Sequence, residues 1–279
     1  MPLVSILTAA FHAADTILEA VKSVRAQSHD NWEIIIASDC GTDYLSLCRR
    51  AAILDERIRM VITPQPGSGP AAARNLALRQ ARGEYVAVLD SDDTWQPEKL
   101  AVLHPLAGQT GLACDNTRAV DPNGALIATA YPEGGPPRRI GAVTMMATGM
   151  PHFPLFRREL AGMGYRSELR FAEDVVFNME LIARAGAMML SPQPLTHYFQ
   201  RPVSLTNAPD AWRRAEAAYG QILTQLDRGR LAVPAGEEAA IRQAVADKRH
   251  LNLAYGEAVM AGTATTFQSF LANRKKSSG

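Results

Sequence analysis

Several features that define other classes of protein are scarce in this sequence. Cysteine occurs only three times in 279 residues, as Cys40, Cys48 and Cys114. Their odd number and their spacing argue against a disulfide framework and indicate free thiols in a reducing compartment, so we expect a cytoplasmic protein. The formal net charge is only +1, which lacks the basic excess of a protein whose main partner is nucleic acid.

Long apolar runs are missing as well. No stretch of about eighteen uninterrupted apolar residues occurs, so we expect no transmembrane helix. The apolar segment Pro2–Phe11 has no basic leader and is followed by His12 and Asp15. A buried first strand therefore explains it better than a signal peptide does. Any association with a membrane would be peripheral.

The sequence does contain a regular alternation of short apolar runs and amphipathic segments. With 47% hydrophobic residues it can bury a large core. The alternation predicts an α/β fold in which a mostly parallel sheet carries helices on both faces and binds ligands beyond the carboxyl ends of its strands. The expected strands lie at 3–8, 32–37, 59–63 and 85–90, and the expected helices at 13–27, 44–54 and 70–82.

The pattern changes after Gly111. We expect strands at 112–115 and 125–130, joined through the turn at 121–124 and forming a mixed or antiparallel part of the sheet. Later elements are a long loop rich in Pro and Gly, a strand, and a helix from about Phe171 to Ala185 that Gly186 ends. The loop covers 131–139 and the strand 153–156.

A domain over residues 1–207 is expected to precede a C-terminal helical region over 208–279. Helical spacing places Trp212, Ala215, Tyr219, Ile222 and Leu226 on one face. Further helices are expected at 236–261 and 265–271, before a basic tail at 273–279. This region could cover an acceptor site, form a homodimer interface or dock on a membrane surface, and the sequence leaves these three roles open.

The run that ends in Asp90, Ser91, Asp92 and Asp93 carries the strongest chemical signal. Three carboxylates within four residues follow an apolar strand. Their mutual repulsion favours a cation at this place, and carboxylate oxygens suit Mg²⁺ or Mn²⁺. A helix N-cap would explain one of these acids but not three.

Five signals follow one another along the chain: Val4–Thr8, Ile34–Asp43, Ala73-Arg74-Asn75, Gly83-Glu84-Tyr85 with the acids that follow, and Glu173-Asp174. Together they make the chain resemble a family-2 glycosyltransferase of the GT-A fold. The resemblance covers about residues 2–206 and implies a Rossmann-like mixed sheet with an α-helical C-terminal extension. It implies inverting transfer of a sugar from a nucleotide diphosphate donor to a hydroxyl acceptor, with Mn²⁺ or Mg²⁺, in the synthesis of a glycan, polysaccharide or glycoconjugate.

The resemblance implies roles for the acids after the strand. Asp93 would bind the metal ion, and Asp92 would share the metal or contact the ribose. Asp90 either contacts the ligand directly or only orients the other two. Such a metal ion neutralises the charge that builds on the leaving diphosphate.

Residues at the ends of the first two strands would bind the nucleotide. Asp39 matches the acid that binds the ring N–H of uracil, which favours a UDP-sugar, although Ser38, Cys40 and Gly41 depart from the family pattern. Phe11 would stack on the nucleobase, with a plain core aromatic as the alternative. Ala9 belongs to the same nucleotide-sugar-binding set.

Arg74 lies near the start of a helix after Gly67-Ser68-Gly69. Its guanidinium, together with backbone N–H groups at the helix start, could bind the donor phosphates. The alternative is a surface arginine paired with a nearby acid.

The Glu-Asp pair would serve the acceptor. The resemblance makes Asp174 the catalytic base, which removes the proton of the acceptor hydroxyl, and makes Glu173 a group that binds the acceptor or holds the base. Favourable interaction with the helix dipole would also explain both acids. Arg201 would support the site by closing over the diphosphate. His152 and His197 are more typical of packed or surface residues than of metal ligands.

Other functions fit the sequence less well. A sugar-phosphate nucleotidyltransferase needs a glycine-rich basic loop after the first strand, whereas residues 8–13 contain neither glycine nor lysine. A dehydrogenase needs Gly-x-Gly-x-x-Gly there. A catalytically silent nucleotide-binding or assembly protein on the same fold stays open. The expected partners are a UDP-sugar donor and a glycan or lipid-linked acceptor, with no nucleic acid.

Overall fold

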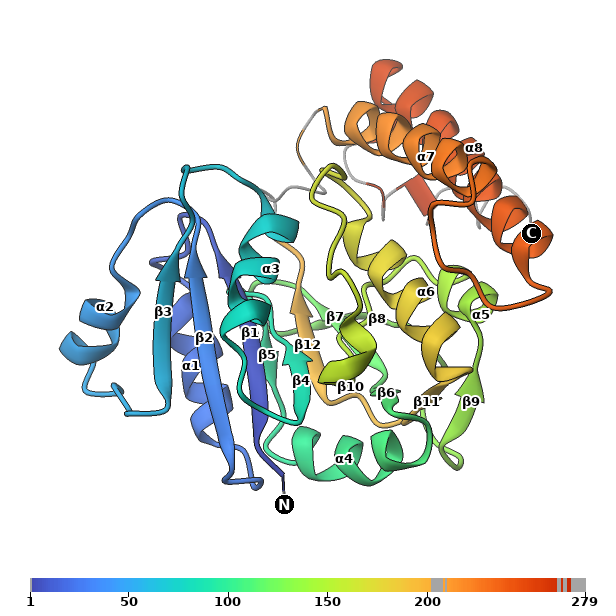
Figure 1. The fold of residues 1–279 in the computed structure, drawn as a ribbon. Helices are drawn as coiled ribbons and strands as arrows, with labels where there is room; N and C mark the ends of the chain where they lie inside the picture. The colour runs from blue at the N-terminus through green and yellow to red at the C-terminus, as the bar shows by residue number, and fades with distance from the viewer. Residues whose placement is uncertain (1, 202–207, 209, 265–266, 268–269, 272–279) are drawn as a thin grey trace.

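The computed structural model describes residues 2–201, 208, 210–264, 267, 270 and 271. Its centre is an eight-stranded mixed sheet with the strand order β3-β2-β1-β4-β10-β6-β11-β9 (Figure 1). Neighbouring strands are parallel from β3 to β4, whereas β10 and β9 run antiparallel to their neighbours. The strands are β1 (Val4–Ala10), β2 (Trp32–Ser38), β3 (Ile58–Ile62), β4 (Tyr85–Val88), β6 (Leu112–Cys114), β9 (Arg138–Ile140), β10 (Leu155–Arg157) and β11 (Met188–Leu190).

Helices cover both faces of this sheet because the side chains of its central strands alternate between two apolar cores. Leu7 and Ile35 point into a core with α3, α5 and α6, whereas Ile6 and Ile34 point into a core with α1, α2 and α4. The helices are α1 (Ile17–Arg25), α2 (Tyr44–Arg50), α3 (Pro70–Gln80), α4 (Lys99–Thr110), α5 (Ala142–Met146) and α6 (Glu173–Ala185), with a short 3₁₀ helix η1 (Arg158–Ala161).

A second sheet of four strands lies beside the carboxyl ends of the main strands. Its order is β5-β12-β7-β8, where β5 is Thr94–Trp95, β7 is Thr117–Val120, β8 is Leu126–Thr129 and β12 is Thr196–Phe199. The expectation that the turn at 121–124 joins the strand at 112–115 to the next one is wrong, because that turn joins β7 to β8. Asn116 lies in the short link between β6 and β7, and its side-chain amide forms hydrogen bonds with the backbone of Tyr131 and Pro192.

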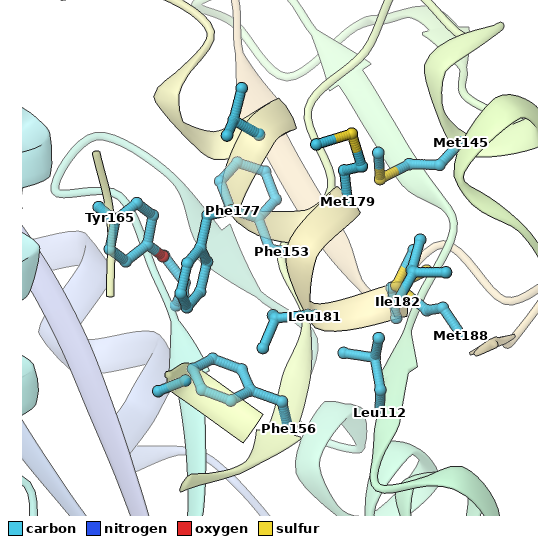
Figure 2. Close-up of a cluster of buried hydrophobic side chains, with 14 of the residues drawn as sticks. Leu112, Met145, Phe153, Phe156, Tyr165, Phe177, Met179, Leu181, Ile182 and Met188 are labelled. Carbon is cyan, nitrogen blue, oxygen red and sulfur yellow. The ribbon is translucent and has the colours of Figure 1, made fainter. Parts of the chain in front are cut away.

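Aromatic and methionine side chains fill the core between α6 and the sheet. Figure 2 shows Phe177 of α6 between Tyr165 and Phe156. The ring centroids of Tyr165 and Phe177 lie 4.0 Å apart in a stacked arrangement, and Phe156 meets Phe177 edge-on at 5.5 Å. This packing holds the first turn of α6, with its two acids, against the end of the sheet.

Two long helices, α7 (Ala211–Asp227) and α8 (Glu238–Met260), form a C-terminal hairpin. They lie side by side over α5 and α6 (Figure 1), and Gly256 allows the contact because a Cβ there would lie 2.5 Å from the ring of Trp212. Ile222, Ile241 and Val245 join the core that α6 also lines. The helix expected at 265–271 and the tail at 273–279 lie largely or wholly outside the described residues. None of the helices in the described part of the chain has the length and apolar character that crossing a bilayer requires.

Candidate active site

The acids at 90–93 follow β4 at the carboxyl end of the main sheet. Asp93 is almost fully buried, and its Oδ1 accepts a hydrogen bond from the backbone N–H of Phe199 at 3.0 Å. Its Oδ2 is buried without a hydrogen-bond partner among the described residues. Burial, followed by the charges of Asp92 and Asp90, raises the pKa of Asp93 well above its usual value. An unpartnered buried carboxylate oxygen beside two more acids suits a bound cation.

Asp92 lies closer to solvent, with 40% of its side chain exposed. Burial of the carboxyl group and the charge of Asp90 raise its pKa to about 6. The Nε atom of Arg201 lies 4.0 Å from Oδ2 of Asp92. The structure therefore places Arg201 beside the acid cluster, and its expected closure over a diphosphate stays a prediction.

Arg74 lies in the interior rather than on the surface. One Nη atom donates to Oδ1 of Asp90 at 2.6 Å, and the other donates to Oε1 of Glu173 at 2.9 Å. Burial opposes its charge, but the carboxylates of Asp90 and Glu173 outweigh burial and raise the pKa of Arg74 well above its usual value. The guanidinium thus connects the acid cluster after β4 to the acids that begin α6.

Glu173 and Asp174 form the first turn of α6, directly after Ala172, whose positive φ of 59° marks a tight entry into the helix. Asp174 lines a cavity of about 20 Å³ together with Asp90, His152 and Asn178. That volume is enough for one water molecule or one hydroxyl group. Burial raises the pKa of Asp174, which makes its carboxylate a stronger base.

Asp39 directly follows β2 and holds the loop before α3 by hydrogen bonds. Its Oδ1 accepts hydrogen bonds from the hydroxyl of Thr63 at 2.7 Å and the N–H of Ser68 at 2.9 Å, and its Oδ2 accepts from the N–H of Gly69 at 2.8 Å. The amides of Ser68 and Gly69, which we expected at a phosphate, are therefore bound to this carboxylate.

Phe11 extends from the end of β1 next to Asp39, whose N–H donates to the carbonyl of Ala10. Its side chain is 53% exposed, so the alternative of a plain core aromatic is wrong. Ala9 is half-buried on the same strand. An exposed ring beside a buried acid at adjacent strand ends is an arrangement that fits a nucleobase.

A buried ion pair behind the acid cluster was not apparent from the sequence. Lys99 is fully buried, and its Nζ donates to Oδ1 of Asp115 at 2.7 Å and to the hydroxyl of Thr196 at 2.5 Å. These contacts join α4 to both sheets. In the sequence, Lys99 is a lysine in the first turn of a helix, which by itself does not indicate a buried ion pair.

The two candidate histidines have structural partners. The ring of His152 is buried and bonds the hydroxyl of Tyr131 at 2.8 Å, and burial lowers its pKa to about 4. His197 contacts the amide of Gln96. Within the described residues no group of three or more His, Cys, Asp or Glu side chains could hold a metal ion by itself. Mg²⁺ sites often use only one or two carboxylates, with water and substrate phosphates as the other ligands.

The chain belongs to glycosyl transferase family 2, because the model of that family matches residues 5–162, more than half of the chain. One relative is the UDP-Glc:alpha-D-GlcNAc-diphosphoundecaprenol beta-1,3-glucosyltransferase WfaP of Escherichia coli, 43% identical over 102 residues that cover 36% of this chain and 39% of WfaP. The matched segments span less than two fifths of the length of the first curated relatives.

Two solved structures share the fold. TarS 1-349 of S. aureus in complex with UDP-GlcNAc has a TM-score of 0.68 and 20% identity, over 89% of this chain and 72% of TarS. The mannosyltransferase PcManGT of Pyrobaculum calidifontis, in complex with GDP-Man and Mn²⁺, has a TM-score of 0.63 and 17% identity, over 99% of this chain and 80% of PcManGT. The expected GT-A type of fold, with its helical C-terminal region, is confirmed.

Proposed function

We propose that this protein transfers a sugar, with inversion, from a UDP-sugar to a hydroxyl group of a growing glycan or glycoconjugate. The observation that carries the proposal is the connection through Arg74 between two acidic half-sites. Asp90 and its neighbours stand at the end of the sheet, and Asp174 lines a cavity of hydroxyl size. Transfer needs a donor site and a base that are held in a fixed relation to each other, and the bridge through Arg74 would supply it.

Asp93 and Asp92 would hold the divalent ion, Mn²⁺ or Mg²⁺. Two observations support this assignment: Oδ2 of Asp93 has no hydrogen-bond partner in the part of the chain that the structure describes, and the pKa values of both acids are raised. When bound, such an ion neutralises negative charge on a diphosphate leaving group. Arg201, next to Asp92, would add a second positive group on the solvent side of the diphosphate.

Asp174 would accept the proton of the attacking hydroxyl on its carboxylate. Glu173 is fixed by its bond to Arg74, so it would orient the acceptor or the base rather than exchange protons itself. General-base assistance of this kind typically contributes about 10²- to 10⁴-fold to the rate.

The uracil ring would lie against Phe11 and above Ala9. An ionised carboxylate has about four acceptor positions, and three on Asp39 are used within the protein. The remaining position would accept the ring N–H of the base. In this proposal Asp39 both binds the base and fixes the loop at 67–69, and Arg74 aligns the acids rather than touching phosphate.

A lipid-linked acceptor is supported by the name of WfaP, which describes a diphosphoundecaprenol substrate for that protein. Such an acceptor would place the enzyme in the cytoplasm, peripherally at the membrane surface. The division into a transferase domain over 1–207 and a helical region over 208–279 belongs to the same proposal, as does a homodimer through the C-terminal helices.

Calorimetric titration with UDP, GDP and dTDP, each with Mn²⁺ and then with EDTA, tests the donor class without knowledge of the acceptor. We expect binding of UDP that requires Mn²⁺ and disappears in Asp93→Asn. Asp15→Asn, at an exposed acid outside the site, serves as the matched control. Binding of GDP or dTDP in preference would refute the UDP assignment, and metal-independent binding would refute the role of Asp93. A protein that binds UDP but never consumes a UDP-sugar would be the silent binder.

A further inference from the structure

One carboxylate oxygen of Asp93 is held by the backbone of a strand in the second sheet. The N–H of Phe199, the last residue of β12, donates to Oδ1 of Asp93 at 3.0 Å. Two residues further along the chain, Nε of Arg201 lies 4.0 Å from Oδ2 of Asp92. The position of β12 along its own axis therefore decides whether Asp93 has its backbone donor and where Arg201 lies.

The other end of β12 is held by the buried ion pair. Nζ of Lys99 donates to Oδ1 of Asp115 at 2.7 Å and to the hydroxyl of Thr196, the first residue of β12, at 2.5 Å. Oδ2 of Asp115 accepts a hydrogen bond from the N–H of Leu195 at 3.1 Å. The side chains of Lys99 and Asp115 are each only 1% exposed. One ammonium group and one carboxylate thus bind two consecutive residues where the strand begins.

The strands of the second sheet are short, so their backbone ladder specifies the register of β12 only weakly. β12 has four residues, and its neighbours β5 and β7 have two and four. A shift of one residue would turn every side chain of β12 to the opposite face. It would take Thr196 away from the ammonium group and Phe199 away from Asp93. Fixing a register is the best-attested use of buried ionic groups.

We propose that Lys99 is a positioning residue for the metal site: with Asp115 it fixes the register of β12, and the strand aims the carboxylate of Asp93 through the N–H of Phe199. The inference rests on the proposed function, because it takes Asp93 as the residue that binds the divalent ion. A hydrogen-bond partner of a metal ligand typically contributes about 10- to 100-fold to metal affinity. Lys99 acts through β12, so we expect an effect at the lower end of that range.

Two variants disturb the start of β12 without leaving a buried charge unpaired. Thr196→Val removes one hydroxyl and keeps the ion pair, so the charges around Asp93 stay the same. Lys99→Met/Asp115→Asn removes both charges together, because loss of one alone would strand the other in the interior. Thr129→Val is the matched control, since Thr129 is a half-buried threonine on β8, which β7 separates from β12. Thermal melting of each variant establishes the temperature at which all are folded.

Hydrogen exchange of the full chain in EDTA measures the bond from Phe199 to Asp93 directly. We expect the N–H of Phe199 to exchange about tenfold faster in the double variant and about threefold faster in Thr196→Val. The control should exchange at the wild-type rate. The N–H of Ile35, a fully buried residue of β2, reports the stability of the main sheet and should change by a smaller factor than that of Phe199.

Calorimetric titration with UDP in excess Mn²⁺ tests whether this bond serves the metal site. We expect about tenfold weaker binding in the double variant and about threefold weaker binding in Thr196→Val, with no change in the control.

An unchanged exchange rate of Phe199 in both variants would overturn the proposal. So would acceleration by the same factor at Phe199 and Ile35, which indicates lost stability alone, or faster exchange at Phe199 without any loss of UDP affinity. A wild type that binds no UDP with Mn²⁺ would refute the proposed function and with it the metal role of β12. That result differs from an unchanged exchange rate in a wild type that does bind UDP.

Discussion

The crowded acids should make the metal-free protein less stable at neutral pH than it would be without them. The pKa of Asp92 is raised from 3.8 to about 6 by burial and by Asp90. A tenfold change in an ionisation constant corresponds to about 1.4 kcal/mol, so an ionised Asp92 would cost the native state at most ~3 kcal/mol. Because 40% of the side chain is exposed, solvent screening reduces this cost to about 1 kcal/mol.

The perturbation is Asp92→Asn, which removes the charge and keeps the shape. In EDTA at pH 7.5 we expect it to raise the free energy of unfolding by about 1 kcal/mol, which for a chain of this size corresponds to about 2 °C in Tm. A carboxyl group whose pKa is raised in the native state lowers the free energy of unfolding only at a pH at which the group ionises in the unfolded chain. The gain should therefore be complete above about pH 6 and shrink as the pH falls from 6 toward 3.8, below which Asp92 is protonated in both the native and the unfolded state.

The assay is thermal denaturation of the wild type, Asp92→Asn and the control Asp15→Asn, each with EDTA and with Mn²⁺. Mn²⁺ should stabilise the wild type more than Asp92→Asn, because binding to the native state raises Tm by mass action. An Asp92→Asn protein that melts below the wild type in EDTA at pH 7.5 would refute the reasoning, since the carboxylate would then be a net stabilising group.

Two further outcomes are expected. Asp174→Asn should keep UDP binding but lose at least about 100-fold in transfer rate. The wild-type rate should fall as the pH is lowered through the raised pKa of Asp174, because the carboxylate then takes up a proton and no longer acts as a base. Near-normal turnover in the variant would place the base elsewhere. Arg74→Met should lower the free energy of unfolding, measured in urea, by about 3–5 kcal/mol, because Asp90 and Glu173 lose their shared partner. Arg74→Lys should recover only part of that free energy. A loss below about 1 kcal/mol in Arg74→Met would mean that water replaces the guanidinium.

Elements with strong local signals could be predicted from the sequence. Helix α6 ends at Ala185 before Gly186, whose φ of +79° only glycine adopts without strain, and the expected end was the same. The apolar run into Asp90 forms β4 as expected. These elements depend on periodicity and on terminating residues that lie within one short window.

The partners of Arg74 could not be predicted in this way. Its neighbours in sequence suggested a phosphate, whereas its nearest charges are Glu173, 99 positions further along, and Asp90, just after β4. Lys99 was missed for the same reason, because Asp115 and Thr196 reach it only through tertiary packing. The second sheet was also missed, since strands as short as β5 and β7 carry little periodic signal.

The bond between Arg74 and Glu173 also affects the order in which the chain becomes functional. During synthesis the acid cluster emerges long before α6, so a nascent chain that has folded its first strands holds Arg74 with only one of its two carboxylate partners. The bridge closes when α6 docks, and both half-sites become fixed in that one event. In the proposed function, the acids of the donor side and the base Asp174 would therefore become positioned in the same folding event.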